Sequence, residues 1–284
     1  MEFRTVVDIR KQCFTIEPCE RMLFVGSCFA DSIGRRFRDE GFPVTVNPYG
    51  TMYNPVSILH TVTRWIAEQT GDVTWPHTVF FTLGTNHVYR LKETGEIVDN
   101  CQKRPAALFQ EEQLSVEQCA DALKQAIDQL RRRQPDVQVV LTVSPIRYRK
   151  YGYHESQLSK ATLLLAAERV VSDVSHDRQH APGSTQRVAY FPSYEIVMDE
   201  LRDYRFYAAD MLHPSEQAVD YIWERLVEAC FSQDAKTFLD EWHPVKQALG
   251  HRPFHPDSDD YRALMDKTML KLAALRKKYP TFAL

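Results

Sequence analysis

The sequence lacks long apolar runs, and its charge is close to balanced. Its 35 Lys and Arg residues against 38 Asp and Glu residues give a net charge of −3, so no global basic field attracts nucleic acid. No apolar run is long enough to cross a bilayer, and the N-terminus shows no secretory signal. We therefore expect a cytoplasmic protein with no membrane span and no nucleic-acid partner. Its oligomeric state is unknown from these residues.

The spacing of cysteines and glycines excludes several kinds of site. The six cysteines form no Cys-x-x-Cys pair, which favours reduced thiols over a disulfide framework. No residue cluster has the spacing of a zinc site, and Gly26, Gly34 and Gly41 do not form a phosphate-binding loop. We therefore expect neither a metal nor a cofactor.

Short apolar runs alternate with helical patterns along the chain. With 284 residues, 44% of them hydrophobic, the chain is long enough for one large core. The predicted strands are residues 22–25, 42–46, 78–83, 137–143 and 187–191. Each parallel crossover needs a long connection, and helical patterns fill these connections. The order predicts an α/β fold, a three-layer α/β/α sandwich with a central, mainly parallel five-stranded sheet.

The chain divides into two predicted parts. Residues 1–231 form the α/β domain, with a hairpin insertion around 88–110 where apolar and polar residues alternate. A helix over 156–175 and a polar loop over 176–186 precede the fifth strand. Residues 232–284 carry two more helical patterns, and we expect this extension to pack on the domain or on a partner.

Polar clusters follow the predicted strands at one edge of the sheet. Open parallel sheets bind ligands at the carboxyl ends of their strands. The clusters at that edge are 26–27, 47–50, 84–86, 144–147 and 210–213. Their common location predicts a functional site there.

Ser27 is the candidate nucleophile in the first of these clusters. Gly26 permits a tight turn from strand to helix, which places Ser27 at a helix N-terminus. Unpaired N–H groups and the helix dipole would stabilise an oxyanion there. The alternative, that Ser27 only caps the helix, is about equally favoured by the segment alone.

The segment Asp210-Met211-Leu212-His213 supplies a candidate base. A serine hydroxyl needs a base, usually a histidine that a carboxylate orients, and His213 and Asp210 fit these roles. Pro214 suits the first position of a helix over 214–231. Without a catalytic role, Asp210 would be a turn residue and His213 a capping or surface residue.

Cys28 is an alternative nucleophile. The arguments from base and oxyanion apply to the residue directly after the glycine. We expect Cys28 to point a third of a helical turn away from that position, so the sequence favours Ser27.

The segment Gly26-Ser27-Cys28-Phe29-Ala30 is the signature of the GSCFA family, and the chain resembles this family of SGNH (GDSL-like) esterases. The resemblance extends through segments 47–55, 84–86, 100–103, 144–147 and 210–213. It implies that Ser27 is the nucleophile, His213 the base and Asp210 its orienting acid. It also implies an oxyanion hole formed by the N–H groups of Ser27 and Gly50 and by the Asn86 amide. Cys28 departs from the aspartate–serine order of the wider superfamily.

The resemblance implies a serine esterase that removes a short acyl group from a carbohydrate or another small polar substrate. An O-acyltransferase with the same triad and a catalytically silent glycan-binding module are the alternatives. Arg147 either meets an anionic or polar group of the substrate or pairs with a carboxylate, and His87 is a candidate for lining the pocket.

Overall fold

A five-stranded parallel sheet forms the centre of the computed structural model, which describes residues 4–71, 73–99, 101, 104–180 and 187–284. Its strands, in the spatial order β2-β1-β3-β7-β8, are β2 (Val44–Val46), β1 (Met22–Gly26), β3 (Thr78–Leu83), β7 (Gln138–Val143) and β8 (Arg187–Tyr190). Each neighbouring pair is parallel. The predicted parallel five-stranded sheet is confirmed.

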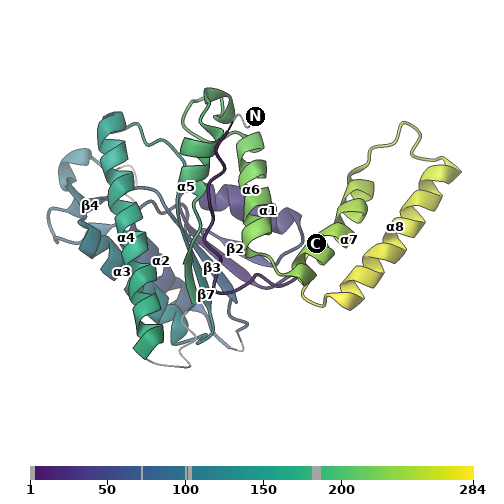
Figure 1. Cartoon of the computed structure of the whole chain (residues 1–284), viewed down its shortest axis with the longest axis horizontal. Coiled ribbons are helices and arrows are strands. Elements are labelled where there is room, and N and C mark those ends of the chain that lie inside the picture. The colour runs from purple at the N-terminus through teal and green to yellow at the C-terminus, as the bar shows by residue number, and fades with distance from the viewer. Residues whose placement is uncertain (1–3, 72, 100, 102–103, 181–186) are drawn as a thin grey trace.

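Helices cover both faces of the sheet, as Figure 1 shows. On one side lie α2 (Pro55–Glu68), α3 (Val116–Arg131) and α4 (Gly152–His180), and on the other lie α1 (Cys28–Asp39) and α6 (Glu216–Cys230). After β8 come the short α5 (Ser193–Glu195), a π-helical segment (Ile196–Leu201) and a 3-10 turn (Tyr204–Phe206). Helix α4 is longer than expected, and residues 181–186 of the expected loop lie outside the described residues.

The alternation of side chains along each strand explains the two helical layers. Successive side chains of a strand point to opposite faces of its sheet. In β1, Met22 and Phe24 belong to the apolar cluster under α1 and α6, whereas Leu23 and Val25 belong to the cluster under α2, α3 and α4. A strand buried on both faces is apolar throughout, which is why the short apolar runs identified the sheet.

The insertion after β3 is a small antiparallel sheet. Its strands are β4 (His87–Leu91), β5 (Ile97–Val98) and β6 (Phe109–Gln113), in the order β5-β4-β6. A 3-10 turn (Ala106–Leu108) leads into β6. The sequence suggested a hairpin because only β4 and β5 are joined by a short turn, whereas β6 pairs with β4 across a longer connection.

The C-terminal helices α7 (Gln233–Gly250) and α8 (Asp259–Lys278) form a pair that extends away from the sheet (Figure 1). The chain after α8 returns to the domain, where the N–H of Ala283 donates to the Gly41 carbonyl at 2.9 Å. Phe282 packs there against the rings of Phe238 and Trp242. No helix in the described part of the chain is both long and apolar enough to span a membrane.

Phe37 tests the packing of the layer that contains α1. Its fully buried ring lies 4.8 Å from Trp223 and 5.2 Å from both Phe24 and Phe42, measured between centroids. We expect Phe37→Ala to lower the free energy of unfolding by about 3–5 kcal/mol, because the cavity is lined by rigid rings. Chemical denaturation measures the change, with Phe37→Leu as the milder control. A loss below about 1 kcal/mol would contradict this packing.

Candidate active site

The turn between β1 and α1 depends on Gly26. Its φ of 144° is rare for residues with a side chain, and an added Cβ would lie 2.2 Å from the Thr82 carbonyl oxygen. The next N–H, that of Ser27, donates to the same oxygen at 2.9 Å. The end of β1 is therefore held tightly against β3, and α1 begins at a fixed place on the sheet.

Ser27 caps α1, and its hydroxyl is directed into the protein. Its Oγ accepts from the N–H of Phe29 at 3.3 Å and lies 3.1 Å from the Thr82 hydroxyl. The residue is only 1% exposed. The structure therefore gives Ser27 the capping role that the sequence allowed as the alternative, and the described contacts of its hydroxyl do not include His213.

Cys28 is the side chain that meets the histidine. Its Sγ lies 3.4 Å from His213 Nε2, and the residue is partly exposed. The expectation that Cys28 points away from the base was wrong. Ser27, as the cap, folds its side chain back over the first turn, so the first helical residue faces the edge of the sheet instead.

Asp210 contacts both the ring and the backbone of His213. One carboxylate oxygen lies 2.5 Å from His213 Nδ1, and the other accepts the N–H groups of Leu212 and His213 at 2.8 and 3.0 Å. These bonds to backbone N–H groups, together with the histidine, lower the pKa of the Asp210 carboxyl to about 2. The ionised carboxylate fixes the proton on Nδ1, which leaves Nε2 as an acceptor toward Cys28.

The Asp210–His213 segment is a closed turn rather than the start of a helix. The N–H of Ala208 donates to the His213 carbonyl at 2.8 Å, and that of Ser215 donates to the Phe206 carbonyl at 2.8 Å. The helix expected from Pro214 begins at Glu216, because the Ser215 hydroxyl accepts from Ala218 and caps α6. Pro214 instead pairs with Tyr207 across the turn.

A buried lysine lies at the ends of β3 and β7, and its charge acts on the cysteine. Lys160 on α4 donates to the carbonyls of Gly84 and Ser144, at 2.7 and 2.8 Å, where β3 and β7 end. Burial raises the pKa of the Cys28 thiol and Asp31 adds to the effect, whereas the charge of Lys160 opposes it. Burial also lowers the pKa of Lys160 to about 7.

Sequence reasoning missed Lys160. The available signal was its place on the inward face of α4, four residues after Ser156 and three before Leu163, all of them buried. A lysine at an inward position of an amphipathic helix needs a polar partner, and here the partners are strand-end carbonyls.

Arg147 holds the histidine turn instead of pairing with a carboxylate. Its N–H donates to the Leu212 carbonyl and its Nη1 to the Met211 carbonyl, each at 3.0 Å. The guanidinium also lies over the rings of Tyr153, Tyr204 and Tyr207, at 4.4, 5.6 and 5.3 Å. Within the described residues it makes no ion pair.

The donors expected for the oxyanion hole have other partners in this structure. The N–H of Gly50 donates to the Asn47 carbonyl at 2.9 Å, and the Asn86 side-chain amide donates to the Leu114 carbonyl at 2.8 Å. The N–H of Ser27 donates to the Thr82 carbonyl oxygen. The N–H of Cys28, at the first position of α1, has no acceptor within the helix and lies beside the thiol.

His87 begins β4 and is buried in the insertion. Its ring stacks on Tyr151 at 3.9 Å between centroids, and burial lowers its pKa. Neither ring nitrogen has a hydrogen-bond partner among the described residues. In the described part of the chain, it makes no hydrogen bond or ring contact with Cys28 or His213. The segment 100–103 of the resemblance lies outside the described residues, apart from Cys101.

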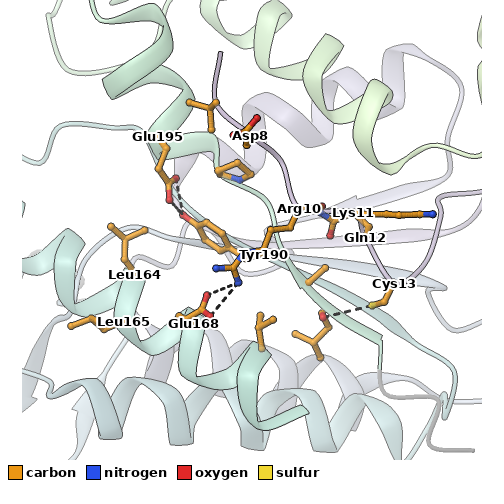
Figure 2. A pocket seen from close by; sticks show the side chains of 15 residues that line it. Asp8, Arg10, Lys11, Gln12, Cys13, Leu164, Leu165, Glu168, Tyr190 and Glu195 are labelled. Carbon is orange, nitrogen blue, oxygen red and sulfur yellow. Dashed lines mark hydrogen bonds and ion pairs between the residues drawn. The ribbon is translucent and has the colours of Figure 1, made fainter. Parts of the chain in front are cut away.

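Two cavities flank α4. One, of about 210 Å³, is lined by Arg147, Lys160 and several tyrosines beside the histidine turn. The other, of about 580 Å³, lies between the N-terminal segment, α4 and β8, where Tyr190 points its hydroxyl at Glu195 and Arg10 pairs with Glu168 (Figure 2). Ser27, Cys28, Asp210 and His213 do not line this larger cavity. The described residues contain no cluster suited to a metal ion.

Solved structures similar to this chain include three proteins at low identity. A carbohydrate esterase family 3 protein from Talaromyces cellulolyticus is 12% identical, with a TM-score of 0.41 over 78% of this chain and 99% of that one. A member of the lipolytic G-D-S-L family from Veillonella parvula is 12% identical, with a TM-score of 0.43 over 73% and 96%. The salicylyl-acyltransferase SsfX3 is 14% identical, with a TM-score of 0.43 over 75% and 54%. At these identities the likeness concerns the fold alone.

Family models give a clearer assignment. The model of the GSCFA family matches residues 21–75 and 72–226, and that of the GSCFA domain protein, C-terminal domain, matches residues 242–284. No curated protein matches the chain. The matched segments include both the Cys28 turn and the Asp210–His213 turn and cover most of the sequence, so the protein belongs to the GSCFA family.

Proposed function

We propose that this protein is an acyl-transfer enzyme that cleaves an ester bond through Cys28, His213 and Asp210. The observation that carries the proposal is the contact of 3.4 Å between the Cys28 sulfur and His213 Nε2, with Asp210 on the other ring nitrogen. A nucleophile, a base in reach and a third group that orients the base are the parts that nucleophilic catalysis requires. This proposal replaces Ser27 with Cys28 in the triad expected from the sequence.

The first half of the reaction forms a thioester. His213 Nε2 takes the proton of the Cys28 thiol, and the thiolate attacks the carbonyl carbon of the ester. The tetrahedral intermediate then collapses, the bond to the alcohol oxygen breaks, and the alcohol leaves with the proton from His213. Asp210 stabilises the imidazolium that exists between these two proton transfers.

The second half releases the acyl group. Water attacks the thioester carbon while His213 takes its proton, and the acid leaves as the proton returns to the Cys28 sulfur. Cys28 and His213 thereby regain their starting protonation states, so the cycle needs no metal, oxidant or cofactor.

The start of α1 supports the negative charge of both tetrahedral intermediates. The N–H of Cys28 and the positive end of the helix dipole lie beside the reacting sulfur, and the charge of Lys160 acts on the same place. One preorganised donor in such a site contributes about 2.7–4 kcal/mol to the rate. Gly50 and Asn86 would have to change partners to serve as further donors.

The substrate we propose is a short acyl ester of a carbohydrate or of another small polar molecule, as the resemblance to SGNH esterases implies. Transfer of the acyl group to an alcohol is the second candidate, because an acyl-enzyme can be resolved by an alcohol as well as by water. Product analysis with an added sugar separates the two. Cys28 contacts His213 and His213 contacts Asp210, which argues against a catalytically silent glycan-binding module.

Substitution of the two adjacent candidates identifies the nucleophile. We expect Cys28→Ala to lower the turnover of p-nitrophenyl acetate by about 10³-fold or more, because the attacking atom is lost. We expect Ser27→Ala to keep activity within about tenfold and to lose about 0.5–2 kcal/mol of stability, the usual effect of losing a helix cap. Cys13→Ala, at an exposed thiol, is the matched control. If Ser27→Ala abolishes turnover and Cys28→Ala does not, Cys28 is not the nucleophile.

Alkylation tests whether His213 activates the thiol. Burial raises the pKa of Cys28, so without a base its reactive thiolate should form only at more alkaline pH than in an ordinary thiol. We expect His213→Ala to slow iodoacetamide labelling of Cys28 at neutral pH by about tenfold or more, with recovery as the pH rises. Peptide mass spectrometry measures the rates, with exposed Cys13 as the internal reference. Equal rates in both proteins at neutral pH would refute activation by His213.

A further inference from the structure

The small cavity beside the histidine turn, here named the Arg147 pocket, has a volume of about 210 Å³. The residues that matter for its chemistry are Arg147, Tyr153, Lys160, Tyr194, Tyr204 and Tyr207. Drug-sized ligands occupy about 300–1,000 Å³, so this cavity suits one small chemical group rather than a whole substrate.

Two residues that line the pocket also interact with the proposed catalytic residues or the turn that carries them. Lys160 lines it, and the charge of this lysine acts on the Cys28 thiol. Arg147 lines it as well and is bound to the carbonyls of Met211 and Leu212, directly before His213. A group attached to an ester at Cys28 is therefore within reach of the pocket.

The pocket is lined by two cations that lack a carboxylate partner among the described residues. Lys160 donates only to the Gly84 and Ser144 carbonyls, and among the described groups only Nη1 of the Arg147 guanidinium has an acceptor, the Met211 carbonyl. Three tyrosine rings hold the guanidinium in place. A fixed, planar set of N–H donors with free positions matches the oxygens of a carboxylate or a phosphate.

The acidic residue that lines the pocket does not neutralise these two cations. Asp203 accepts the N–H of Arg205 at 2.9 Å and pairs with the Arg205 side chain at 3.8 Å. Arg202, also at the pocket, pairs with Asp199 at 3.7 Å. The pairs formed by these outer residues leave the charges of Arg147 and Lys160 uncompensated.

The burial of Lys160 is a second reason to expect an anion in the pocket. A fully buried ammonium group without a counter-charge is costly, and burial lowers the pKa of this lysine to about 7. An anion in the pocket would supply the missing charge and favour the protonated lysine.

We propose that the Arg147 pocket binds a negatively charged group, a carboxylate or a phosphate, that the ester substrate carries. The proposal rests on the proposed function, because the pocket would hold this group while the ester carbon lies at Cys28. It makes Arg147 a specificity-determining residue in addition to its hold on the histidine turn.

Binding to a catalytically inactive protein tests the pocket without relying on turnover. In the Cys28→Ala protein we expect glutarate or inorganic phosphate to bind at least about tenfold more tightly than neutral glutaramide, by isothermal titration calorimetry. Adding Arg147→Gln should weaken anion binding by about tenfold or more, whereas Arg147→Lys, which keeps the charge, should retain most of it. Arg149→Gln, an exposed neighbour that does not line the pocket, is the matched control.

Thermal unfolding of each variant shows whether a loss of binding reflects loss of the fold. If neither anion binds more tightly than glutaramide, or if Arg149→Gln weakens binding as much as Arg147→Gln, the proposal is overturned. A preference for glutarate assigns the pocket to carboxylates and a preference for phosphate assigns it to phosphoryl groups, and either result supports the proposal.

Turnover of two matched esters separates this proposal from the proposed function. We expect the wild-type protein to cleave the mono-p-nitrophenyl ester of glutaric acid with a kcat/KM about tenfold or more above that of p-nitrophenyl valerate. Equal cleavage of both esters would overturn the pocket and leave the proposed function standing. Cleavage of neither ester by a protein that binds glutarate would contradict the proposed function and leave the anion site standing.

Discussion

The close approach of Gly26 to Thr82 determines which side chain faces His213. An added Cβ at Gly26 would lie 2.2 Å from the Thr82 carbonyl oxygen, so only glycine fits where β1 turns into α1. Ser27 then becomes the cap, with its hydroxyl directed toward Thr82 and the first turn of α1. Cys28, the first helical residue, faces the edge of the sheet, where the Asp210–His213 turn places the imidazole. The proposed chemistry depends on this division between a capping serine and a reactive cysteine.

The layers could be predicted from sequence because a strand that is buried on both faces is apolar at nearly every position. Met22, Leu23, Phe24 and Val25 are all apolar, and their alternate members pack under different helices. The roles of Ser27 and Cys28 could not be separated in this way. Both the cap and the nucleophile fit the position after a glycine, and only the backbone conformation of the turn decides between them. The start of α6 is a similar case. Pro214 and Glu216 both suit the first position of a helix, and the helix begins at Glu216 because Ser215 caps it.

Much of the surrounding site arises from contacts between distant parts of the chain. Lys160 reaches the ends of β3 and β7 from α4, and Arg147 reaches the histidine turn from the end of β7. The sequence predicted that Asp210 and His213 belong together because they are three residues apart, and their geometry follows from the turn itself. For Asn86, the resemblance implied a role toward the oxyanion, whereas the structure directs its amide to Leu114 in the insertion. Such choices depend on tertiary packing that local patterns do not encode.

The most direct measurement is the identity of the atom that carries the acyl group. The wild-type protein is mixed with p-nitrophenyl acetate, quenched in acid within the first turnovers, digested and mapped by mass spectrometry. We expect an acetyl group on Cys28 that neutral hydroxylamine removes, because the bond is a thioester. An acetyl group on Ser27, or ester cleavage with no acyl group on Cys28, would contradict it.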